Sequence, residues 1–477
     1  MSVTLDDLVR HHAAGPHQPA AEIAAGVARR GRVLVVLDDD PTGTQSVADL
    51  PVLTAWDVDS LAWALQQREP AVYVMTNSRS LAPADAARVN REVVTSALAA
   101  ARETGVTVGF VSRSDSTLRG HFPLETDTIA ETLAELDGPH VDGVVLVPAF
   151  GDAGRVTVDA VHHAGNPVDG YTPVGETEFA RDATFGYASS DLRDWVAEKS
   201  GTTREQSRVV SLGLDLLRQD RAGTVALLRS LTHGQPVVAD IVDENDLRLL
   251  SAALLEAEAA GSTFLYRVGP PFPRAFIGQE PRTPLTSAEV ARIRDGGLAE
   301  DATGGLVVVG SHVALTTRQL DALRERTQPV ELEIDVPTVR SEDRDAHLLA
   351  VIDTVVEALA TGTVVVRTSR TLVRGDDADS SLDIARTVST AVVEVVQQVL
   401  ARRAPRFVVA KGGITSSDVA SRGLGIARAY VRGPMLPGIV SLWEPVDGPA
   451  RGIPYIVFAG NVGTDASLAD VVDTLSR

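Results

Sequence analysis

The sequence predicts an α/β protein of two lobes, each a largely parallel sheet flanked by helices, with the active site in the cleft between them. Its 477 residues exceed one ordinary domain of about 150 residues. Short apolar runs alternate with amphipathic stretches along most of the chain, which is typical of strand–helix units. A segment rich in proline and glycine, residues 270–304, interrupts this alternation. We therefore expect that segment to connect two lobes.

The first lobe, residues 1–269, is expected to alternate buried strands with helices. Apolar runs bounded by turn residues predict strands at Val33–Leu37, Val72–Met75, Val108–Val111, Val144–Val147 and Pro236–Ile241. Amphipathic stretches predict helices at Ala20–Arg30, Pro83–Glu103, Leu124–Leu136 and Asp243–Ala260. Because helices separate the strands, the strands are expected to run parallel.

The second lobe, residues 305–477, repeats the pattern and ends in a closing helix. The predicted strands are Leu306–Val309, Val330–Val336, Thr363–Arg367, Phe407–Ala410 and Tyr455–Phe458. The predicted helices lie near Thr316–Arg326, Asp343–Ala360 and Leu382–Arg403.

Composition excludes several classes of function. Asp and Glu number 64 against 44 Lys and Arg, a formal charge of −20, which disfavours nucleic acid or an anionic membrane as the main partner. The chain has no cysteine, so disulfides, thiol nucleophiles and cysteine-bound metals are excluded. No stretch approaches the roughly 18 apolar residues of a membrane span, and the N-terminus does not read as a signal peptide. A cytoplasmic protein without membrane contact is expected.

Acidic and basic side chains follow the strands of the first lobe, where parallel sheets bind ligands. Asp38, Asp39 and Asp40 come directly after the first strand. Three adjacent carboxylates raise one another's pKa unless cations offset them. This arrangement favours Mg²⁺ binding or general-base duty, and a solvated turn is the alternative. Two further strand ends carry hydroxyl and guanidinium groups suited to a polyhydroxylated carboxylate or a phosphate: Asn77-Ser78-Arg79, and Arg113 with Asp115-Ser116-Thr117 and Arg119.

Glycine-rich turns follow the strands of the second lobe. They are Gly310-Ser311, Gly412-Gly413 with Thr415, and Gly460-Asn461-Val462-Gly463. Glycines let a phosphate approach free backbone N–H groups at a helix start, and Lys411 adds a charge there. Ordinary strand-to-helix turns are the alternative interpretation, since neither a Walker A loop nor a G-x-G-x-x-G fingerprint is present. Three such turns suggest a polyphosphate such as ATP.

These motifs occur in the order seen in the four-carbon acid sugar kinases, and the chain resembles that family from about Val33 to its C-terminus. The resemblance rests on Asp39-Asp40-x-Thr42-Gly43, Asp115-Ser116-Thr117-Leu118-Arg119-Gly120, Pro148-Ala149-Phe150 with Gly154-Arg155, Gly412-Gly413-x-Thr415 and Gly460-Asn461-x-Gly463. It implies an N-terminal acid-sugar-binding domain, a C-terminal nucleotide-binding domain, and ATP-dependent phosphorylation of the terminal hydroxyl of a tetronate-type acid. The sequence departs from the common family pattern at Pro41, Arg113, Ile414 and Val462, so the acid sugar can differ from the best-known ones.

The resemblance also assigns site residues. It implies that the acid sugar contacts Asp39, Arg79, Ser116, Thr117, Arg119 and Gly120. It implies that ATP contacts Ser311, Gly412, Gly413, Ile414, Thr415 and Gly460, with Mg²⁺ bridging the phosphates. Asp40 or Asp115 would accept the proton of the attacking hydroxyl, and Arg79 or Arg119 would hold the substrate carboxylate. The expected partners are the acid sugar and ATP, without nucleic acid or membrane; the oligomeric state stays open, a homo-oligomer included.

Two other functions compete with this interpretation. Asp38-x-Asp40 after a strand has the spacing of the nucleophile motif of haloacid-dehalogenase-like phosphatases, and Gly375–Asp379 could imitate their distal acids. That alternative leaves the Asp115–Gly120 motif and the glycine turns unexplained. A non-catalytic protein that binds the sugar acid or the nucleotide is the third option.

Overall fold

The structure is a computed structural model that describes residues 3–370 and 378–477. The chain forms two compact units. Unit 1 comprises Met1–Gly43 and Trp56–Pro281, and unit 2 comprises Thr44–Ala55 and Arg282–Arg477. The contiguous division predicted from the sequence is therefore wrong in one respect, because a short N-terminal segment belongs to unit 2.

Unit 1 is built on a parallel sheet whose strands have the order β3-β1-β4-β11-β5-β10-β9. The strands are β1 (Arg32–Asp38), β3 (Ala71–Met75), β4 (Thr107–Arg113), β5 (Gly143–Val147), β9 (Val210–Leu212), β10 (Gln235–Ala239) and β11 (Phe264–Val268). Most of their side chains are buried, as expected for a sheet covered on both faces. The predicted strands of this lobe are confirmed, whereas β9 and β11 were not predicted.

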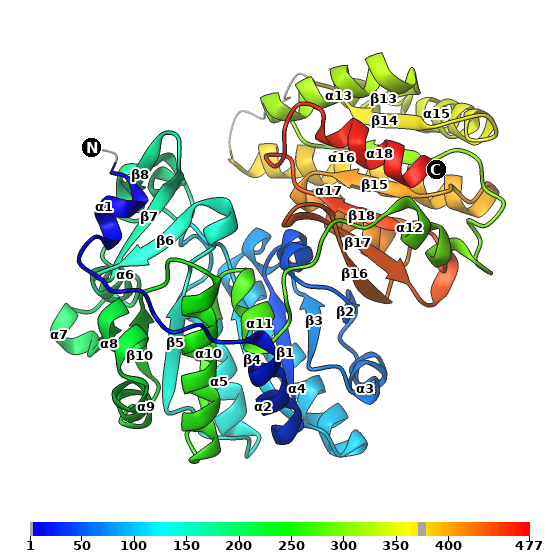
Figure 1. The fold of residues 1–477 in the computed structure, drawn as a ribbon. Helices are drawn as coiled ribbons and strands as arrows, with labels where there is room; N and C mark the ends of the chain where they lie inside the picture. The colour runs from blue at the N-terminus through cyan, green and yellow to red at the C-terminus, as the bar shows by residue number, and fades with distance from the viewer. Residues whose placement is uncertain (1–2, 371–377) are drawn as a thin grey trace. The chain divides into compact units, whose positions relative to one another are not determined.

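Two groups of helices cover this sheet, and within each group the helices pack against one another (Figure 1). One group comprises α3 (Val58–Gln66), α4 (Pro83–Thr104) and α5 (Leu124–Glu135). The other comprises α2 (Ala20–Arg30), α8 (Leu214–Gln219), α9 (Arg221–Arg229), α10 (Glu244–Ala259) and α11 (Pro271–Phe276). Local chemistry sets their ends: α4 begins with Pro83 and stops at Gly105, whose φ is 65°, because glycine adopts the left-handed region without strain.

A small antiparallel sheet, which the sequence did not predict, is inserted between β5 and β9. It comprises β6 (Arg155–Val158), β7 (Val161–Asn166) and β8 (Gly170–Pro173), followed by α6 (Leu192–Lys199) and α7 (Arg204–Ser207). Asp240, at the end of β10, accepts hydrogen bonds from the backbone N–H groups of Asp159 and Ala160 at 2.7 and 2.8 Å. The N-terminal arm, with α1 (Leu5–Val9), pairs with this sheet through Val3 and Tyr171. The small sheet is thereby tied to the carboxyl edge of the large one.

Unit 2 contains a mixed sheet with the order β13-β14-β12-β15-β18-β17-β16-β2. Its parallel strands are β12 (Leu306–Val309), β13 (Val330–Ile334), β14 (Val364–Thr368), β15 (Val408–Lys411) and β18 (Tyr455–Phe458). The antiparallel ones are β2 (Leu50–Leu53), β16 (Arg428–Leu436) and β17 (Ile439–Pro445). The predicted strands are confirmed, and the antiparallel part is an addition that the alternating pattern did not indicate.

The N-terminal segment in unit 2 is held by its side chains as well as by β2. Thr44 accepts a hydrogen bond from the Trp443 indole at 3.0 Å and lies 2.8 Å from the Ser441 hydroxyl. Asp49 forms ion pairs with Arg282 at 2.7 Å and with Arg432 at 3.2 Å. All these contacts lie within unit 2, so the chain leaves unit 1 after Gly43 and returns to it at Trp56.

The segment 270–304, expected to be irregular, contains two helices. They are α11 and α12 (Ser287–Arg294). Proline is tolerated in the first turn of a helix because its missing N–H would have no intrahelical acceptor there, and Pro271 begins α11. Phe272 and Phe276 are buried against Tyr266, with ring centroids 5.3 and 5.2 Å away. This aromatic packing anchors α11 in unit 1.

The remaining helices belong to unit 2. They are α13 (Ala314–Thr327), α14 (Val336–Val339), α15 (Arg344–Ala358), α16 (Ala378–Arg402), α17 (Gly413–Asp418) and α18 (Ser467–Ser476). Contrary to the expectation from sequence, one stretch, Asp383–Arg402 in α16, is long and apolar enough to cross a membrane. Of the most apolar window in this stretch, 39% is buried within the protein.

Candidate functional site

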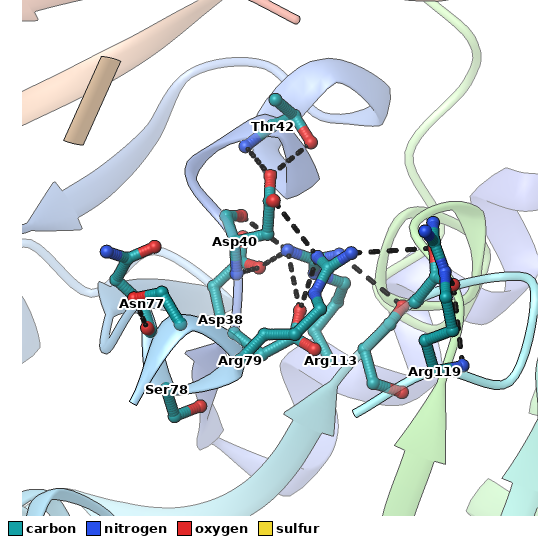
Figure 2. Close-up of polar contacts among 12 residues, drawn as sticks. Asp38, Asp40, Thr42, Asn77, Ser78, Arg79, Arg113 and Arg119 are labelled. Atoms are coloured by element: carbon teal, nitrogen blue, oxygen red, sulfur yellow. Dashed lines mark hydrogen bonds and ion pairs between the residues drawn. The ribbon is translucent and has the colours of Figure 1, made fainter. Parts of the chain in front are cut away.

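The carboxyl ends of three neighbouring strands in unit 1 bring the predicted polar residues together. In the parallel register, Asp38 at the end of β1 lies beside Met75 of β3 and Arg113 of β4. The loops that follow these strands therefore start at one edge of the sheet. Their side chains form a connected network of ion pairs around Arg79 and Arg113 (Figure 2).

Asp38 is buried and serves the structure of the loop. It forms an ion pair with Arg113, which is also buried, and Arg113 lies 3.3 Å from Asp39. Gly43 passes directly over this pair: a Cβ atom there would lie 2.2 Å from a carboxylate oxygen of Asp38 and 2.3 Å from Nε of Arg113. Only glycine fits, so the loop closes over Asp38. This position does not suit the nucleophile that the phosphatase alternative requires.

Arg79 joins three carboxylates from two loops. Its guanidinium lies 3.1 Å from Asp39, 3.2 Å from Asp40 and 3.6 Å from Asp115. Asn77 adopts a left-handed conformation with φ of 52°, and the Arg79 backbone N–H donates to the carbonyl of Asp39 at 3.3 Å. The turn and the ion pairs together fix Arg79 at the centre of the site.

The Asp115 carboxylate is fully engaged. Burial favours its neutral form, but Arg79, Arg119 and the Thr117 hydroxyl outweigh burial and hold the pKa of Asp115 well below its usual value. Arg119 Nε donates to Asp115 at 2.8 Å, and the Thr117 hydroxyl donates to the same oxygen. Asp115 is thus a fixed anion with little tendency to accept a proton.

Asp39 and Asp40 have contrasting surroundings. Burial raises the pKa of Asp39 to about 7, although Arg79 acts against this shift. One oxygen of Asp39, Oδ2, is buried and makes no hydrogen bond among the described residues. Asp40 keeps 24% of its side chain exposed and accepts a hydrogen bond from the backbone N–H of Thr42 at 2.9 Å. The three adjacent carboxylates thus differ in accessibility and in hydrogen bonding.

Two residues that the sequence did not single out as site residues support the Asp115–Gly120 loop from the inserted small sheet and the segment after it. His162 Nε2 lies 2.8 Å from the carbonyl of Ser116, and the Tyr187 hydroxyl donates to the carbonyl of Thr117 at 2.7 Å. Burial lowers the pKa of His162 to about 4, so the ring is neutral. Because a carbonyl only accepts, Nε2 carries the proton, and Nδ1 accepts from the Thr157 hydroxyl at 2.9 Å.

Other side chains at this edge of the sheet were also missed by sequence reasoning. Arg119 lies 3.7 Å from Asp182, and the guanidinium carbons of Arg119 and Arg155 lie 5.5 and 5.6 Å from the centre of the Phe179 ring. Arg267, on β11, donates to the carbonyl of Arg119 at 3.4 Å. Of these additional residues, only Arg155 had a sequence signal, through the family motif. Phe179, Asp182 and Arg267 come from segments without a recognisable pattern.

The predicted nucleotide-contacting residues converge in unit 2. β12, β15 and β18 are adjacent, with Val309 beside Lys411 and Lys411 beside Phe458. A Cβ atom on Gly460 would lie 2.3 Å from Oγ of Ser311, and one on Gly310 would lie 2.1 Å from Oγ1 of Thr415. The three turns thus touch one another at glycine positions, where an added Cβ atom would displace the facing hydroxyl group or the turn.

The backbone of these turns suits an anion. Gly412 has φ of 130°, which favours glycine, and Gly413 begins α17. Ile414, the position that departs from the family pattern, is 59% exposed beside them. Thr316 donates to the carbonyl of Gly460 at 2.9 Å and so orients that turn. Glycine backbones and helix starts are the usual elements of phosphate binding.

Lys411 does not extend as a free charge. Its side chain is buried, donates to the carbonyl of Ala459 at 2.6 Å and lies 3.8 Å from the centre of the Phe458 ring. Burial lowers the pKa of Lys411 to about 7. The lysine therefore links the end of β15 to the turn after β18.

No protein-only metal cage is visible in the described part of the chain. Within residues 3–370 and 378–477, no three His, Asp or Glu side chains are grouped as metal ligands. The acidic triplet at the end of β1 is paired with arginines instead. The Gly375–Asp379 acids of the phosphatase alternative lie outside the residues whose side chains are described.

Comparisons with solved structures agree with this fold. A crystal structure of a Haemophilus influenzae protein has a TM-score of 0.61 at 18% identity, covering 92% of this chain and 100% of that one. A Salmonella typhimurium LT2 protein whose structure carries the name putative tRNA synthase has a TM-score of 0.64 at 18% identity, covering 92% and 98%. At such identity the likeness concerns the fold alone.

Comparisons of the sequence are more specific. Residues 34–276 match the family described as a sugar-binding N-terminal domain, and residues 306–468 match the one described as a nucleotide-binding C-terminal domain. A D-threonate kinase of Salmonella typhimurium LT2 is 24% identical over 460 residues, covering 92% of this chain and 97% of its own length. Nothing in these matches supports a phosphatase. The chain belongs to the four-carbon acid sugar kinase family and is a phosphotransferase.

Proposed function

We propose that this protein phosphorylates the terminal hydroxyl of a four-carbon, tetronate-type acid with ATP as the donor. The observation that carries the proposal is the clustering of Asp39, Arg79, Asp115 and Arg119 at one sheet edge. Fixed carboxylates and guanidiniums bind hydroxyl and carboxylate groups. The similarity to a D-threonate kinase adds a candidate substrate. We place the reaction in the cytoplasm, where ATP is available.

Within unit 1, the proposed acid-sugar site keeps the residues that the family motif assigns. They are Asp39, Arg79, Ser116, Thr117, Arg119 and Gly120. Asp40 is the better candidate to accept the proton of the attacking hydroxyl, because its side chain is partly exposed and Thr42 orients it. Asp115, the other candidate, is held as an anion by two arginines. Its role in the proposal is to order the substrate loop.

Within unit 2, backbone N–H groups of the glycine turns would bind the phosphates of ATP. The residues proposed to contact ATP are Ser311, Gly412, Gly413, Ile414, Thr415 and Gly460. Mg²⁺ bound to the phosphates would neutralise charge during transfer. Given the absence of a carboxylate cage among the described residues, we expect the nucleotide itself to supply most of its ligands. The protein contributes position and fixed dipoles.

The test is a screen of both enantiomers of threonate and erythronate for ATP-dependent release of ADP. We expect turnover with at least one of these acids and none without an acid. The Asp40→Asn variant should lower kcat by about 100-fold or more, with a small change in KM, because a positioned base contributes about that much. The surface variant Asp59→Asn is the matched control. If no acid gives ADP, the proposed function is refuted. If the Asp40→Asn variant keeps the kcat of the wild type, a residue other than Asp40 is the general base.

A further inference from the structure

Arg267 is a buried guanidinium at the carboxyl edge of the unit 1 sheet. It lies on β11 and is 5% exposed. Its one hydrogen bond within the described chain goes to the carbonyl of Arg119 at 3.4 Å, and its Nε has no acceptor. Its guanidinium carbon lies 5.8 Å from the centre of the Phe122 ring. A buried guanidinium with so few partners is costly unless an anion joins it.

Three neighbouring arginines are already neutralised by carboxylates, whereas Arg155, which is only partly buried, has no ion pair among the described residues. Arg79 contacts Asp39, Asp40 and Asp115; Arg113 contacts Asp38 and Asp39; Arg119 contacts Asp115 and Asp182. None of the ion pairs within 4.0 Å found in the described residues involves Arg267. Glu125, Asp39 and Asp115 act on it only over longer distances, and burial lowers its pKa.

Arg294 of unit 2 is another buried arginine, but its charge is compensated by a helix end. Arg294 is also buried and also lacks a carboxylate partner within the described chain, but it donates to the carbonyl of Leu475 at 3.2 Å. That carbonyl lies in the last turn of α18, where the helix dipole favours a cation. Arg267 lies on a strand and has no such compensation.

Asp39 provides the complementary group. Its Oδ2 is buried and makes no hydrogen bond to any residue that the structure describes. A Cβ atom built on Gly120 would lie 3.3 Å from this oxygen and 3.4 Å from Nη2 of Arg267. The absent side chain of Gly120 thus faces an acceptor without a hydrogen bond among the described residues and a guanidinium nitrogen whose hydrogen bond to the carbonyl of Arg119 is long, at 3.4 Å. An acceptor and a guanidinium are the two groups that bind a hydroxyl and a carboxylate on adjacent carbons.

We propose that Arg267 holds the substrate carboxylate while Asp39 Oδ2 accepts the hydroxyl on the neighbouring carbon. The inference rests on the proposed function and changes one part of it. Arg79 and Arg119 order the acidic side chains, and the substrate carboxylate is bound by Arg267, which lies outside the family motifs. Glycine is favoured at position 120 by its φ of 121°, and a side chain there would also reach toward both groups. The site thereby selects 2-hydroxy acids over neutral polyols.

The test measures binding by calorimetry in the full-length chain, without ATP, using the four tetronates and the amide of the tightest-binding acid. In Arg267→Gln, affinity for the acid should fall about 10- to 100-fold, because a charged hydrogen bond is lost. Affinity for the neutral amide should change little, and the Kd for ATP should stay the same. Arg267→Lys, which keeps the charge without the planar fork, should fall between these values. Arg294→Gln, a matched change at a buried arginine that also lacks a carboxylate partner among the described residues, should bind the acid like the wild type.

The second half of the inference has its own readout. In Asp39→Asn, affinity should fall more for the tetronate than for 3,4-dihydroxybutanoate, which lacks the hydroxyl next to the carboxylate. If Arg267→Gln does not fold, Arg267→Lys and Asp39→Asn carry the test. Equal discrimination between acid and amide in wild type and Arg267 variants overturns the inference and leaves the kinase proposal intact. Failure of the wild type to bind any tetronate overturns both.

Discussion

At the scale of single residues, the environment determines what each carboxylate and amine can do. Asp38, Asp39 and Asp40 are identical in chemistry and adjacent in sequence. Asp38 is buried against Arg113, and Asp40 is partly exposed. Asp39 is buried, and one of its oxygens has no hydrogen-bond partner in the described part of the chain. Desolvation and neighbouring charges separate groups of the same type in this way. A run of acids in a sequence therefore says little about which one accepts a proton.

Lys411 leads to a prediction on pH. Burial lowers its pKa from 10.5 to about 7, so between these values the unfolded chain carries a proton that the folded chain lacks. The free energy of unfolding should then rise with pH, by up to about 1.4 kcal/mol per pH unit from this residue. Below pH 7 both states are protonated, and this gain is absent.

Urea unfolding of the wild type and of Lys411→Met at pH 7, 8 and 9 would measure this effect. The difference in unfolding free energy, wild type minus variant, should increase with pH because methionine cannot titrate. The lost hydrogen bond to Ala459 affects the variant equally at each pH. Parallel pH profiles for the two proteins would contradict the prediction.

At the scale of elements, both candidate sites are formed by loops on the carboxyl side of parallel strands. Adjacent strands bring loops together that are distant in sequence, as Ser311, Gly412 and Gly460 show. The loops touch so closely that small residues are needed at the contacts. The strands thus determine where a ligand can bind, and the loop residues determine its chemistry.

Gly460→Ala tests this close contact. The new Cβ atom would stand 2.3 Å from Oγ of Ser311, so the Ser311 side chain or the turn must shift. We expect the KM for ATP to rise about tenfold, equivalent to about 1.4 kcal/mol, with the KM for the acid unchanged. Gly362→Ala, where a Cβ would meet nothing within 4 Å, is the control. A rise in both KM values would show that the turn serves more than the nucleotide.

At the scale of the whole molecule, the chain passes between its two units three times. It leaves unit 1 after Gly43, returns at Trp56 and leaves again after Pro281. The first excursion supplies β2, which pairs with β16 over Arg428–Val431. Unit 2 is therefore incomplete without residues from the N-terminal part of the chain.

A fragment of residues 282–477 should consequently be much less stable than one that carries residues 44–55 fused through a flexible linker. Without β2, the edge of β16 is unpaired, and the burial of Leu50, Val52 and Leu53 is lost. Each such side chain contributes about 1.5–3 kcal/mol when fully buried. Thermal unfolding of both fragments measures the difference, and the fusion with Val52→Asp serves as control. Equal melting temperatures would show that β2 is dispensable.

Elements with local signals were predictable from sequence. The helix Ala20–Arg30 and the strands Leu306–Val309 and Tyr455–Phe458 were predicted with the bounds that the structure has. β2 was missed because four apolar residues resemble any short buried segment, and its partner strand lies more than 350 residues away in sequence. β16 was missed because Gly433 and Pro434 break its pattern, and the pairing with β17 absorbs that break as an irregularity in register.

The amino-acid sequence alone determined the α/β class, the family and the groups of polar residues that follow the strands. Periodicity and short motifs are local properties, which a linear pattern records. Only the tertiary structure decided which segments complete unit 2 and which of three aspartates stays accessible. It also decided that Arg267, near Asp39, has no ion pair among the residues that the structure describes. Those outcomes depend on burial and on distances between residues far apart in the chain, because desolvation and ion pairing act through space and not along the sequence.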